Sequence, residues 1–287
     1  MSADAPRFSV IVPTYERPDA LRRCLEGFTR LVYPAWELLV VNDGGATSFS
    51  AIGGDLRAKL PLQLIDAPHK GPAAARNAGA RAARGEYLAF TDDDCVPEPD
   101  WLQQLRRGFA ETGSAALGGS CLNPYPESVP AVTWEVYLNF LREYFQDVSG
   151  NALMQPTNNV AYRADAFWAV QGFDESFPLA AGEDLDLSYR IVGAGFRQGY
   201  FDPARVWHFH RSTAKGYLRQ QYRYGRGTFD LNKREYSLQL RPRKFGEFYW
   251  RLAEFLVREQ APAGVWVLVG LTPLAHRWGI ISQRFRA

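Results

Sequence analysis

Short apolar runs alternate with helical stripes in the first part of the chain. Four runs have the length and composition of buried strands, at residues 8–12, 36–41, 62–65 and 87–90. Between them, Pro18 opens a helix with apolar residues at positions i, i+3, i+4 and i+7, and Gly71 and Pro72 open an alanine-rich helix at 73–83. This alternation predicts an α/β fold, a doubly wound and mostly parallel sheet flanked by helices.

The pattern is looser beyond Gly118, but strands and helices still alternate. Strands are predicted at residues 117–121, 158–162 and 200–210, and helices at 133–145, 164–170 and 181–196. The helix at 133–145 is rich in aromatic residues. We interpret Trp134 and Tyr137 as core side chains rather than as platforms for a sugar.

Charge is distributed unevenly along a chain of otherwise ordinary globular composition. Of 287 residues, 46% are hydrophobic and 22% are charged, with a net charge of +2. Residues 205–287 hold 16 Lys and Arg against 5 Asp and Glu, a charge of +11, so residues 1–204 carry −9. An acidic body suits metal and phosphate chemistry, and a basic tail suits an anionic surface. Because no recognised nucleic-acid module is present, we expect a membrane surface and no nucleic-acid partner.

The tail also contains an apolar segment. Glu259 and Arg277 bracket 17 residues without a charged side chain. A spanning helix needs about 20 apolar residues, so we interpret the segment as a core or interfacial helix. Three widely spaced cysteines and an N-terminus without a signal-peptide pattern predict a cytoplasmic protein, peripheral at the cytoplasmic face of the membrane.

Three consecutive carboxylates, Asp92, Asp93 and Asp94, follow the apolar run at 87–90. Side chains alternate along an extended chain, so Asp92 and Asp94 are predicted to point one way and Asp93 the other. Residues 97–100, which include Pro97 and Pro99, are predicted to lie outside a strand, because proline donates no ladder hydrogen bond. Oxygen ligands just beyond a strand suit Mg²⁺ or Mn²⁺ with substrate phosphates. The alternative is a solvated turn that caps the helix near Trp101.

Two further strand ends carry polar side chains, in the segments 14–16 and 42–44. Ligands of an open parallel sheet bind beyond the carboxyl ends of its strands. The three segments are therefore predicted to share one edge of the sheet. There they can hold a nucleoside, with the metal holding its diphosphate.

Five segments in order carry a family likeness: SVIVPTYERPDALRRCLEGF, ELLVVNDGG, GPAAARNAGARAARGEYLAFTDDDCVPEPDWL, NNVAYRADAFWAVQGFDESF, and GEDLDLSYRIVGAGF with VWHFHR. With them the chain resembles the family 2 glycosyltransferases, inverting enzymes of the GT-A fold that use nucleotide-diphosphate sugars. The likeness covers Phe8 to Arg211. It implies a catalytic domain at 1–211, followed by a basic, aromatic-rich helical region at 212–287.

The resemblance assigns roles on the donor side. Asp43 would contact the nucleobase or ribose, and Asn42 is a mild departure where the family often has an acid. Thr14 and Glu16 would belong to the nucleotide-contacting turn, with surface loop residues as the alternative. Arg76 would pair with the diphosphate, or else with a neighbouring carboxylate. In the acidic triplet, whose register is open by one residue, Asp92 and Asp93 would face the donor and Asp94 would bind the metal.

The resemblance also assigns the acceptor side and a further metal ligand. Asp184 would be the base that deprotonates the acceptor hydroxyl, and Glu183 would bind acceptor or orient the loop. Asp186 points about 200° away from Asp184 around a helix and is interpreted as structural. Asn158 and Asn159 would shape the acceptor side. His208 would be a third metal ligand, with His210 as the alternative.

Together these observations predict a glycosyltransferase dependent on Mn²⁺ or Mg²⁺. It would move a sugar from a nucleotide-diphosphate donor to a saccharide or lipid-linked acceptor. A nucleotidyltransferase would need a basic, glycine-rich loop after the first strand, where this chain has PTYERP. A non-catalytic nucleotide-sugar binding module would not need both the acidic triplet and the Glu183-Asp184 pair.

Overall fold

The structure is a computed structural model that describes residues 7–45, 54–146, 151–177, 181–209, 213–234 and 245–285. An eight-stranded sheet has the order β3-β2-β1-β4-β7-β6-β8-β5. Its strands are β1 (Phe8–Thr14), β2 (Trp36–Asp43), β3 (Leu62–Ala67), β4 (Tyr87–Phe90), β5 (Cys95–Pro97), β6 (Ala116–Leu122), β7 (Val160–Arg163) and β8 (Gln198–His208).

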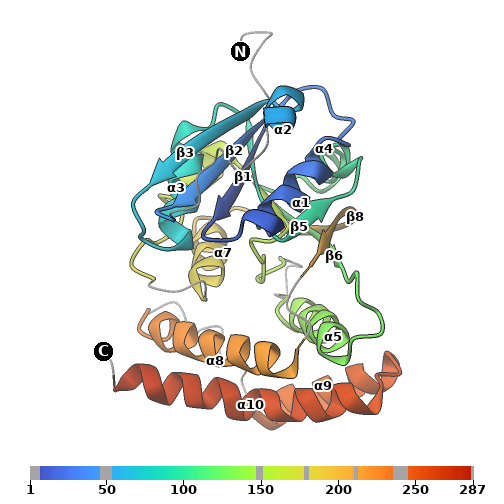
Figure 1. The fold of residues 1–287 in the computed structure, drawn as a ribbon. Coiled ribbons are helices and arrows are strands. Elements are labelled where there is room, and N and C mark those ends of the chain that lie inside the picture. The colour runs from blue at the N-terminus through green and yellow to red at the C-terminus, as the bar shows by residue number, and fades with distance from the viewer. Residues whose placement is uncertain are drawn as a thin grey trace.

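Helices lie on both faces of the sheet and in a separate layer below it (Figure 1). Those of the first part of the chain are α1 (Pro18–Phe28), α2 (Gly54–Lys59), α3 (Pro72–Ala82), α4 (Trp101–Thr112), α5 (Val129–Tyr144), α6 (Ala164–Ala169) and α7 (Glu183–Gly193). The C-terminal helices are α8 (Ala214–Leu231), α9 (Phe245–Arg258) and α10 (Ala263–Arg284).

The sheet is mostly parallel, as predicted. β3, β2, β1 and β4 run parallel, and β6 and β8 are parallel to each other. β7 is antiparallel to both β4 and β6, and β5 is antiparallel to β8. The carboxyl ends of β2, β1 and β4 therefore meet at one edge, which brings together the three polar segments found in the sequence.

The expectation that residues 97–100 lie outside a strand is wrong for Pro97 and correct for the three residues after it. Residues 95–97 form β5, which is the last strand at one side of the sheet. Proline is tolerated there because an edge strand has one side without a ladder partner. The pairing matters for the site, because it sets Cys95 opposite His208.

Two apolar clusters fill the space between the sheet and its helices. On one face, α1 and α4 bury Leu25, Phe28 and Trp101 against β1 and β2. On the other, α3, α6 and α7 pack with Phe90 and Tyr162. Burial of the strands on both faces explains why they read as continuous apolar runs in the sequence.

The C-terminal layer includes α5, a helix from the first part of the chain. A cluster shared by α5, α9 and α10 is formed by Phe140, Leu252, Phe255, Leu256, Val265 and Val269. α5 therefore packs with the C-terminal helices, although it precedes the boundary predicted at residue 211. The division of the chain into two regions at residue 211 remains a prediction.

Glycines bring α8 close to its two neighbours. A Cβ on Gly225 would overlap the carbonyl oxygen of His276 in α10, and one on Gly227 would overlap the carbonyl oxygen of Ala181. Ala181 and Gly182 lead directly into α7. Figure 1 accordingly shows α8 between α7 and α10. The C-terminal layer thus touches the segment that starts with the Glu183-Asp184 pair.

Candidate active site

The acidic triplet forms a turn at the carboxyl end of β4. The amide of Cys95 donates to the carbonyl oxygen of Asp92 at 3.0 Å, which closes a turn over Asp92–Cys95. The carboxylates therefore diverge to different partners, and the predicted strand-like alternation of Asp92 and Asp94 is wrong. Asp93 and Asp94 share one partner, whereas Asp92 binds another.

Arg17 is the partner that Asp93 and Asp94 share, and the sequence reasoning missed it. Its Nη1 lies 2.7 Å from Asp93 Oδ1, and its Nη2 lies 2.5 Å from Asp94 Oδ2. Arg17 stands immediately before α1, in the loop after β1. A basic residue in the predicted strand-end loop, opposite three acids, was the available signal.

Burial and charge act differently on these two acids. Burial raises the pKa of Asp93 to about 7, although Arg17 and the hydroxyl of Thr14, which donates to Asp93 at 2.8 Å, act to lower it. Burial also favours the neutral form of Asp94. The charges and hydrogen bonds of His208 and Arg17 outweigh this effect of burial, so the pKa of Asp94 is lowered. Asp94 is thus the member of this pair with a stably charged carboxylate.

Asp94, Cys95 and His208 could hold a metal ion, since one ligand atom from each lies within 4.8 Å of the others. His208 Nε2 is 3.4 Å from Asp94 Oδ1, and its Nδ1 is 3.2 Å from Asn158 Nδ2. The Oδ1 atom of Asn158 is buried without a hydrogen-bond partner among the described residues. Oxygen and imidazole donors of this kind fit Mn²⁺. His210, the alternative ligand, lies outside the described residues.

Asp43 is tied to the loop before α3. Its Oδ1 accepts from the amides of Lys70 (3.0 Å) and Gly71 (3.2 Å), and its Oδ2 lies 3.1 Å from Nδ1 of His69. The ring of His69 stacks on Tyr15, with centroids 4.3 Å apart. The carboxylate therefore positions an aromatic pair at the edge of the sheet, a second feature that the sequence reasoning missed.

Thr14 and Glu16 flank Tyr15 at the same edge. The hydroxyl of Thr14 is bound to Asp93. Glu16 has a φ of 52°, in the left-handed region, where the chain turns from β1 towards α1. The structure thus brings Thr14 beside the acidic turn and Glu16 beside Gly45, and their contacts with a nucleotide remain predictions.

Arg76 links the acidic turn to the start of α7. It is 3% exposed, and its Nη2 and Nη1 each lie 2.9 Å from a carboxylate, Asp92 Oδ1 and Glu183 Oε1. The sequence left two possible partners for Arg76, the donor diphosphate or a neighbouring carboxylate. In the structure its partners are carboxylates. Two acids 91 positions apart in the chain are therefore within one side chain of each other.

The Glu183-Asp184 pair opens α7 after Gly182, whose φ of 97° suits glycine. Burial, with the adjacent charge of Asp184, raises the pKa of Glu183 to about 7. Burial also raises the pKa of Asp184, whose Oδ1 accepts from the amide of Leu185 at 2.8 Å. A carboxylate with a raised pKa is suited to take up a proton near neutral pH.

Asp186 and Asn159 face away from this chemistry. Asp186 pairs with Arg190, whose guanidinium also donates to the carbonyl oxygen of Gly172. The amide of Asn159 donates to the carbonyl oxygens of Ser120 and Ala204 and accepts from Trp101. Asn159 therefore joins β6, β8 and α4, whereas its neighbour Asn158 points to His208. An acceptor-side role for either residue remains a prediction.

An aromatic pair from the helical layer stands near the acids. Trp134 of α5 stacks on Tyr224 of α8, with centroids 5.7 Å apart and planes 20° from parallel. Burial raises the pKa of Tyr224, and the charges of Asp184 and Glu183 add to this effect. Tyr137 instead packs with the α5–α9–α10 cluster, as expected of a core residue.

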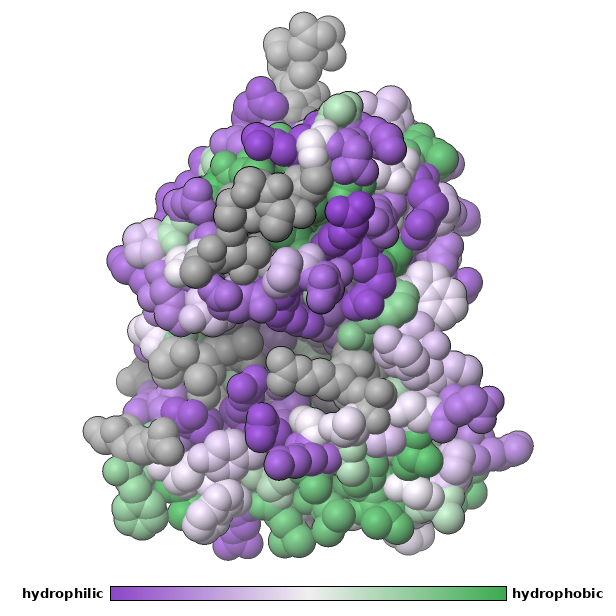
Figure 2. Space-filling view, viewed as in Figure 1, coloured by the Kyte–Doolittle hydropathy of each residue, from purple (hydrophilic) through white to green (hydrophobic). Residues whose placement is uncertain are grey.

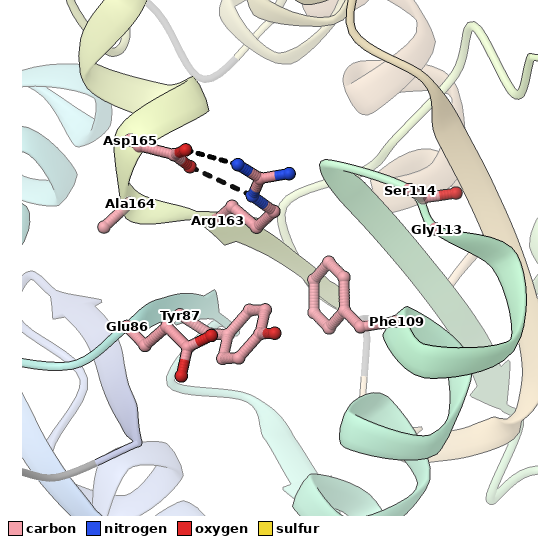
Figure 3. Close-up of a pocket in the computed structure, with 8 residues that line it drawn as sticks. All are labelled: Glu86, Tyr87, Phe109, Gly113, Ser114, Arg163, Ala164 and Asp165. Carbon is pink, nitrogen blue, oxygen red and sulfur yellow. Dashed lines mark hydrogen bonds and ion pairs between the residues drawn. The ribbon is translucent and has the colours of Figure 1, made fainter.

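A surface pocket lies elsewhere, at the amino end of β4. It is lined by Glu86, Tyr87, Phe109, Gly113, Ser114, Arg163, Ala164 and Asp165 (Figure 3). Arg163 and Asp165 are paired with each other across its rim. No predicted site residue lines it, because the acidic turn follows the opposite end of β4.

The fold places the protein in a class, the GT-A glycosyltransferases. Two solved structures share the fold. A mannosyltransferase from Pyrobaculum calidifontis in complex with GDP-Man and Mn²⁺ aligns with a TM-score of 0.65 at 20% identity, covering 99% of this chain and 85% of that one. Residues 1–349 of Staphylococcus aureus TarS in complex with UDP-GlcNAc align with a TM-score of 0.58 at 17% identity, covering 96% and 89%.

The chain belongs to glycosyl transferase family 2, whose model matches residues 9–170. It is 27% identical over 295 residues to glycosyltransferase AglE of Haloferax volcanii, covering 100% of this chain and 87% of that protein. It is 29% identical over 222 residues to a pre-mycofactocin glycosyltransferase of Mycobacterium tuberculosis, covering 76% of this chain but 46% of that protein. The protein is a family 2 glycosyltransferase, as its five sequence segments predicted.

Proposed function

We propose that the enzyme moves one sugar, with inversion, from a nucleotide-diphosphate sugar to a hydroxyl group, with a divalent cation. The observation that carries this proposal is the Arg76 bridge. It joins Asp92 of the acidic turn to Glu183 beside Asp184, so the donor side and the proposed base meet at one site. Such proximity lets two reacting groups be held in one geometry.

The donor is bound along the carboxyl edge of β2, β1 and β4. Thr14, Glu16 and Asp43 serve the nucleoside, and the stacked rings of Tyr15 and His69 offer a flat surface for its base. The acidic turn, which Arg76 holds through Asp92, serves the diphosphate and the sugar. The nucleotide-sugar complexes of the two similar structures support this kind of donor.

Asp94 and His208 would hold Mn²⁺ or Mg²⁺. When bound, the cation neutralises the charge that develops on the departing diphosphate. Asp94 suits this role because its pKa is lowered and its carboxylate remains charged. The Mn²⁺ in the Pyrobaculum mannosyltransferase complex supports dependence on a divalent cation in general.

Asp184 acts as the base. It takes the proton of the acceptor hydroxyl while the hydroxyl oxygen forms a bond to the anomeric carbon. The bond from that carbon to the diphosphate oxygen breaks on the opposite face, and the electron pair leaves with the diphosphate. Glu183 holds Arg76 and orients the start of α7.

The acceptor is a saccharide or a lipid-linked molecule that enters between the sheet and the helical layer. Asn158 and the Trp134–Tyr224 pair line its side of the site. The aromatic faces suit the apolar faces of sugar rings. The basic C-terminal region makes peripheral contact with the cytoplasmic face of a membrane, where lipid-linked acceptors occur.

Calorimetric binding of UDP, GDP, dTDP and CDP, each with and without Mn²⁺, tests the donor site. We expect one nucleotide to bind tightly with Mn²⁺, and Asp94→Ala to abolish the Mn²⁺ dependence. Asp230→Ala, which removes a carboxylate of α8, is the matched control and should bind as the wild type does. If no nucleotide binds under any condition, including with vesicles present, the proposal is wrong.

A further inference from the structure

α10 has an apolar face that the rest of the described chain leaves uncovered. Six of its side chains recur at helical spacing and are between 38% and 67% exposed: Trp266, Val267, Leu271, Leu274, Trp278 and Ile281. We call this set the α10 stripe. Figure 2 shows hydrophobic residues gathered along this edge of the molecule. An uncovered apolar surface of this extent marks an interaction site.

The opposite face of α10 is bound along its length to the protein. Tyr217 and Thr272 share a hydrogen bond of 2.7 Å, Tyr222 and Ser282 one of 2.8 Å, and Arg226 donates to Gln283 at 2.8 Å. By length and composition alone α10 is the one described helix that could cross a membrane. Crossing would require it to leave α8 and break these contacts. The structure therefore favours a helix that stays on α8 and presents only its stripe.

The residues beside the stripe match the boundary between lipid headgroups and acyl chains. α10 contains two tryptophans in the stripe, no acidic residue, and Arg277 and Arg284 with exposed side chains. Neither arginine forms an ion pair with another described residue. Tryptophan prefers this boundary, and cationic side chains there bind lipid phosphates. The charge of +11 over residues 205–287 is complementary to an anionic bilayer.

We propose that α10 lies in the plane of an anionic lipid bilayer, with the α10 stripe buried at the headgroup boundary. This inference rests on the membrane contact in the proposed function but not on the transfer reaction. α8 lies between α10 and the segment before α7. With helix axes packed about 8–10 Å apart, Asp184 stands roughly 20 Å above the membrane. That distance suits a lipid-linked acceptor whose polar head projects from the surface.

Vesicle flotation tests the docking surface with the full chain. Vesicles of phosphatidylcholine alone are compared with vesicles that contain phosphatidylglycerol as well. We expect the wild type to float with the anionic vesicles. Leu274→Asp combined with Trp278→Asp should weaken binding by more than about tenfold, because two charges would enter the apolar boundary. Arg277→Gln combined with Arg284→Gln should weaken binding to anionic vesicles only.

Val32→Asp is the matched control, because Val32 is an exposed apolar residue (64%) after α1, outside the helical layer. It should float as the wild type does. The melting temperature of each variant, compared with that of the wild type, shows that it is folded. A wild type that floats but binds no nucleotide would keep this inference and defeat the transfer proposal.

Lipids with bromine at different depths along the acyl chain test the orientation by quenching tryptophan fluorescence. We expect shallow bromines to quench more than deep ones. Strongest quenching at the bilayer centre would indicate a spanning helix and overturn the in-plane placement. Unchanged flotation of the Leu274→Asp, Trp278→Asp variant would overturn the stripe. The proposal would also be overturned if the wild type bound no vesicle but formed dimers that these two substitutions abolish.

Discussion

Arginines have different surroundings at the sheet edge and in the C-terminal layer. Arg17 and Arg76 each lie between two carboxylates, within 3 Å of them. Arg277 and Arg284 lie exposed beside an apolar stripe, with no ion-pair partner among the described residues. Paired charges fix the position of acids that must meet a substrate. Charges without partners are available to an anion outside the protein.

The two regions also differ in how they are held together. The sheet edge is fixed by charged hydrogen bonds between distant segments, which are strong and directional when partly buried. The helical layer is held by close glycine contacts, by an apolar cluster and by side-chain hydrogen bonds between the neighbouring helices α8 and α10. Substitutions at the edge should therefore change chemistry more than stability, and those in the layer should do the reverse.

The largest effect should come from Asp184→Asn. Without the base, the rate of transfer should fall by about a hundred- to ten-thousand-fold, the usual range for a general base, while donor affinity is kept. Single-turnover transfer and calorimetric donor binding measure the two quantities. Since the pKa of Asp184 is raised, the wild-type rate should increase with pH as this carboxyl loses its proton. The variant should lack that increase.

Asp186→Asn is the control for Asp184→Asn, because Asp186 lies on the same helix but pairs with Arg190. It should lower the melting temperature and leave the pH dependence of transfer in place. Wild-type turnover by Asp184→Asn would remove Asp184 from the mechanism. A loss of donor binding in that variant would mean that the substitution disturbs the whole edge.

The next effect, on stability, should come from Gly225→Ala. Its new methyl group would overlap the carbonyl oxygen of His276, so α8 and α10 would have to separate. Overpacking of this kind costs about 1–3 kcal/mol. Gly270→Ala is the control, because a Cβ there meets nothing within 4 Å. It should stabilise the protein by about 0.5–1 kcal/mol through helix propensity. Equal melting temperatures for the two variants would contradict the glycine contact.

The sequence was most informative where a pattern is local. Strand-sized apolar runs and helical stripes predicted the order of elements, and parallel strands then predicted that 14–16, 42–44 and 92–94 meet. Features that depend on distant pairing were missed. β5 forms at residues 95–97 because β8 pairs with it. Arg17 contacts Asp93 and Asp94 because β1 and β4 are neighbouring strands.

Side-chain direction was the weakest part of the site prediction. Alternation failed at Asp92 and Asp94 because the chain turns at once after β4. Asn158 and Asn159 are adjacent, yet one contacts His208 and the other joins three elements of the core. Periodicity gives relative directions only along a regular strand, and the functional residues lie where regular strands end.

A moderate effect is expected from Arg17→Gln. The change removes one positive charge from beside Asp94, so Mn²⁺ should bind the donor-free protein several-fold more tightly, as measured by calorimetry. The free energy of unfolding should fall by about 1–2 kcal/mol, less than for a fully buried pair, because Arg17 is partly exposed. Arg22→Gln, in an exposed pair on the same helix, should change neither quantity appreciably. Weaker Mn²⁺ binding would mean that Arg17 orients Asp94 instead of opposing the ion.

The smallest effects should distinguish the two aromatic pairs. Tyr15→Leu removes the ring that stacks on His69 at the donor edge, and Tyr224→Leu removes the ring that stacks on Trp134 in the helical layer. A lost stacking contact of about 0.5–1.5 kcal/mol corresponds to a rise of roughly two- to thirteenfold in one KM. Tyr15→Leu should raise the KM for donor, and Tyr224→Leu should raise the KM for acceptor. If both substitutions change the same KM, donor and acceptor are not divided between sheet edge and helical layer.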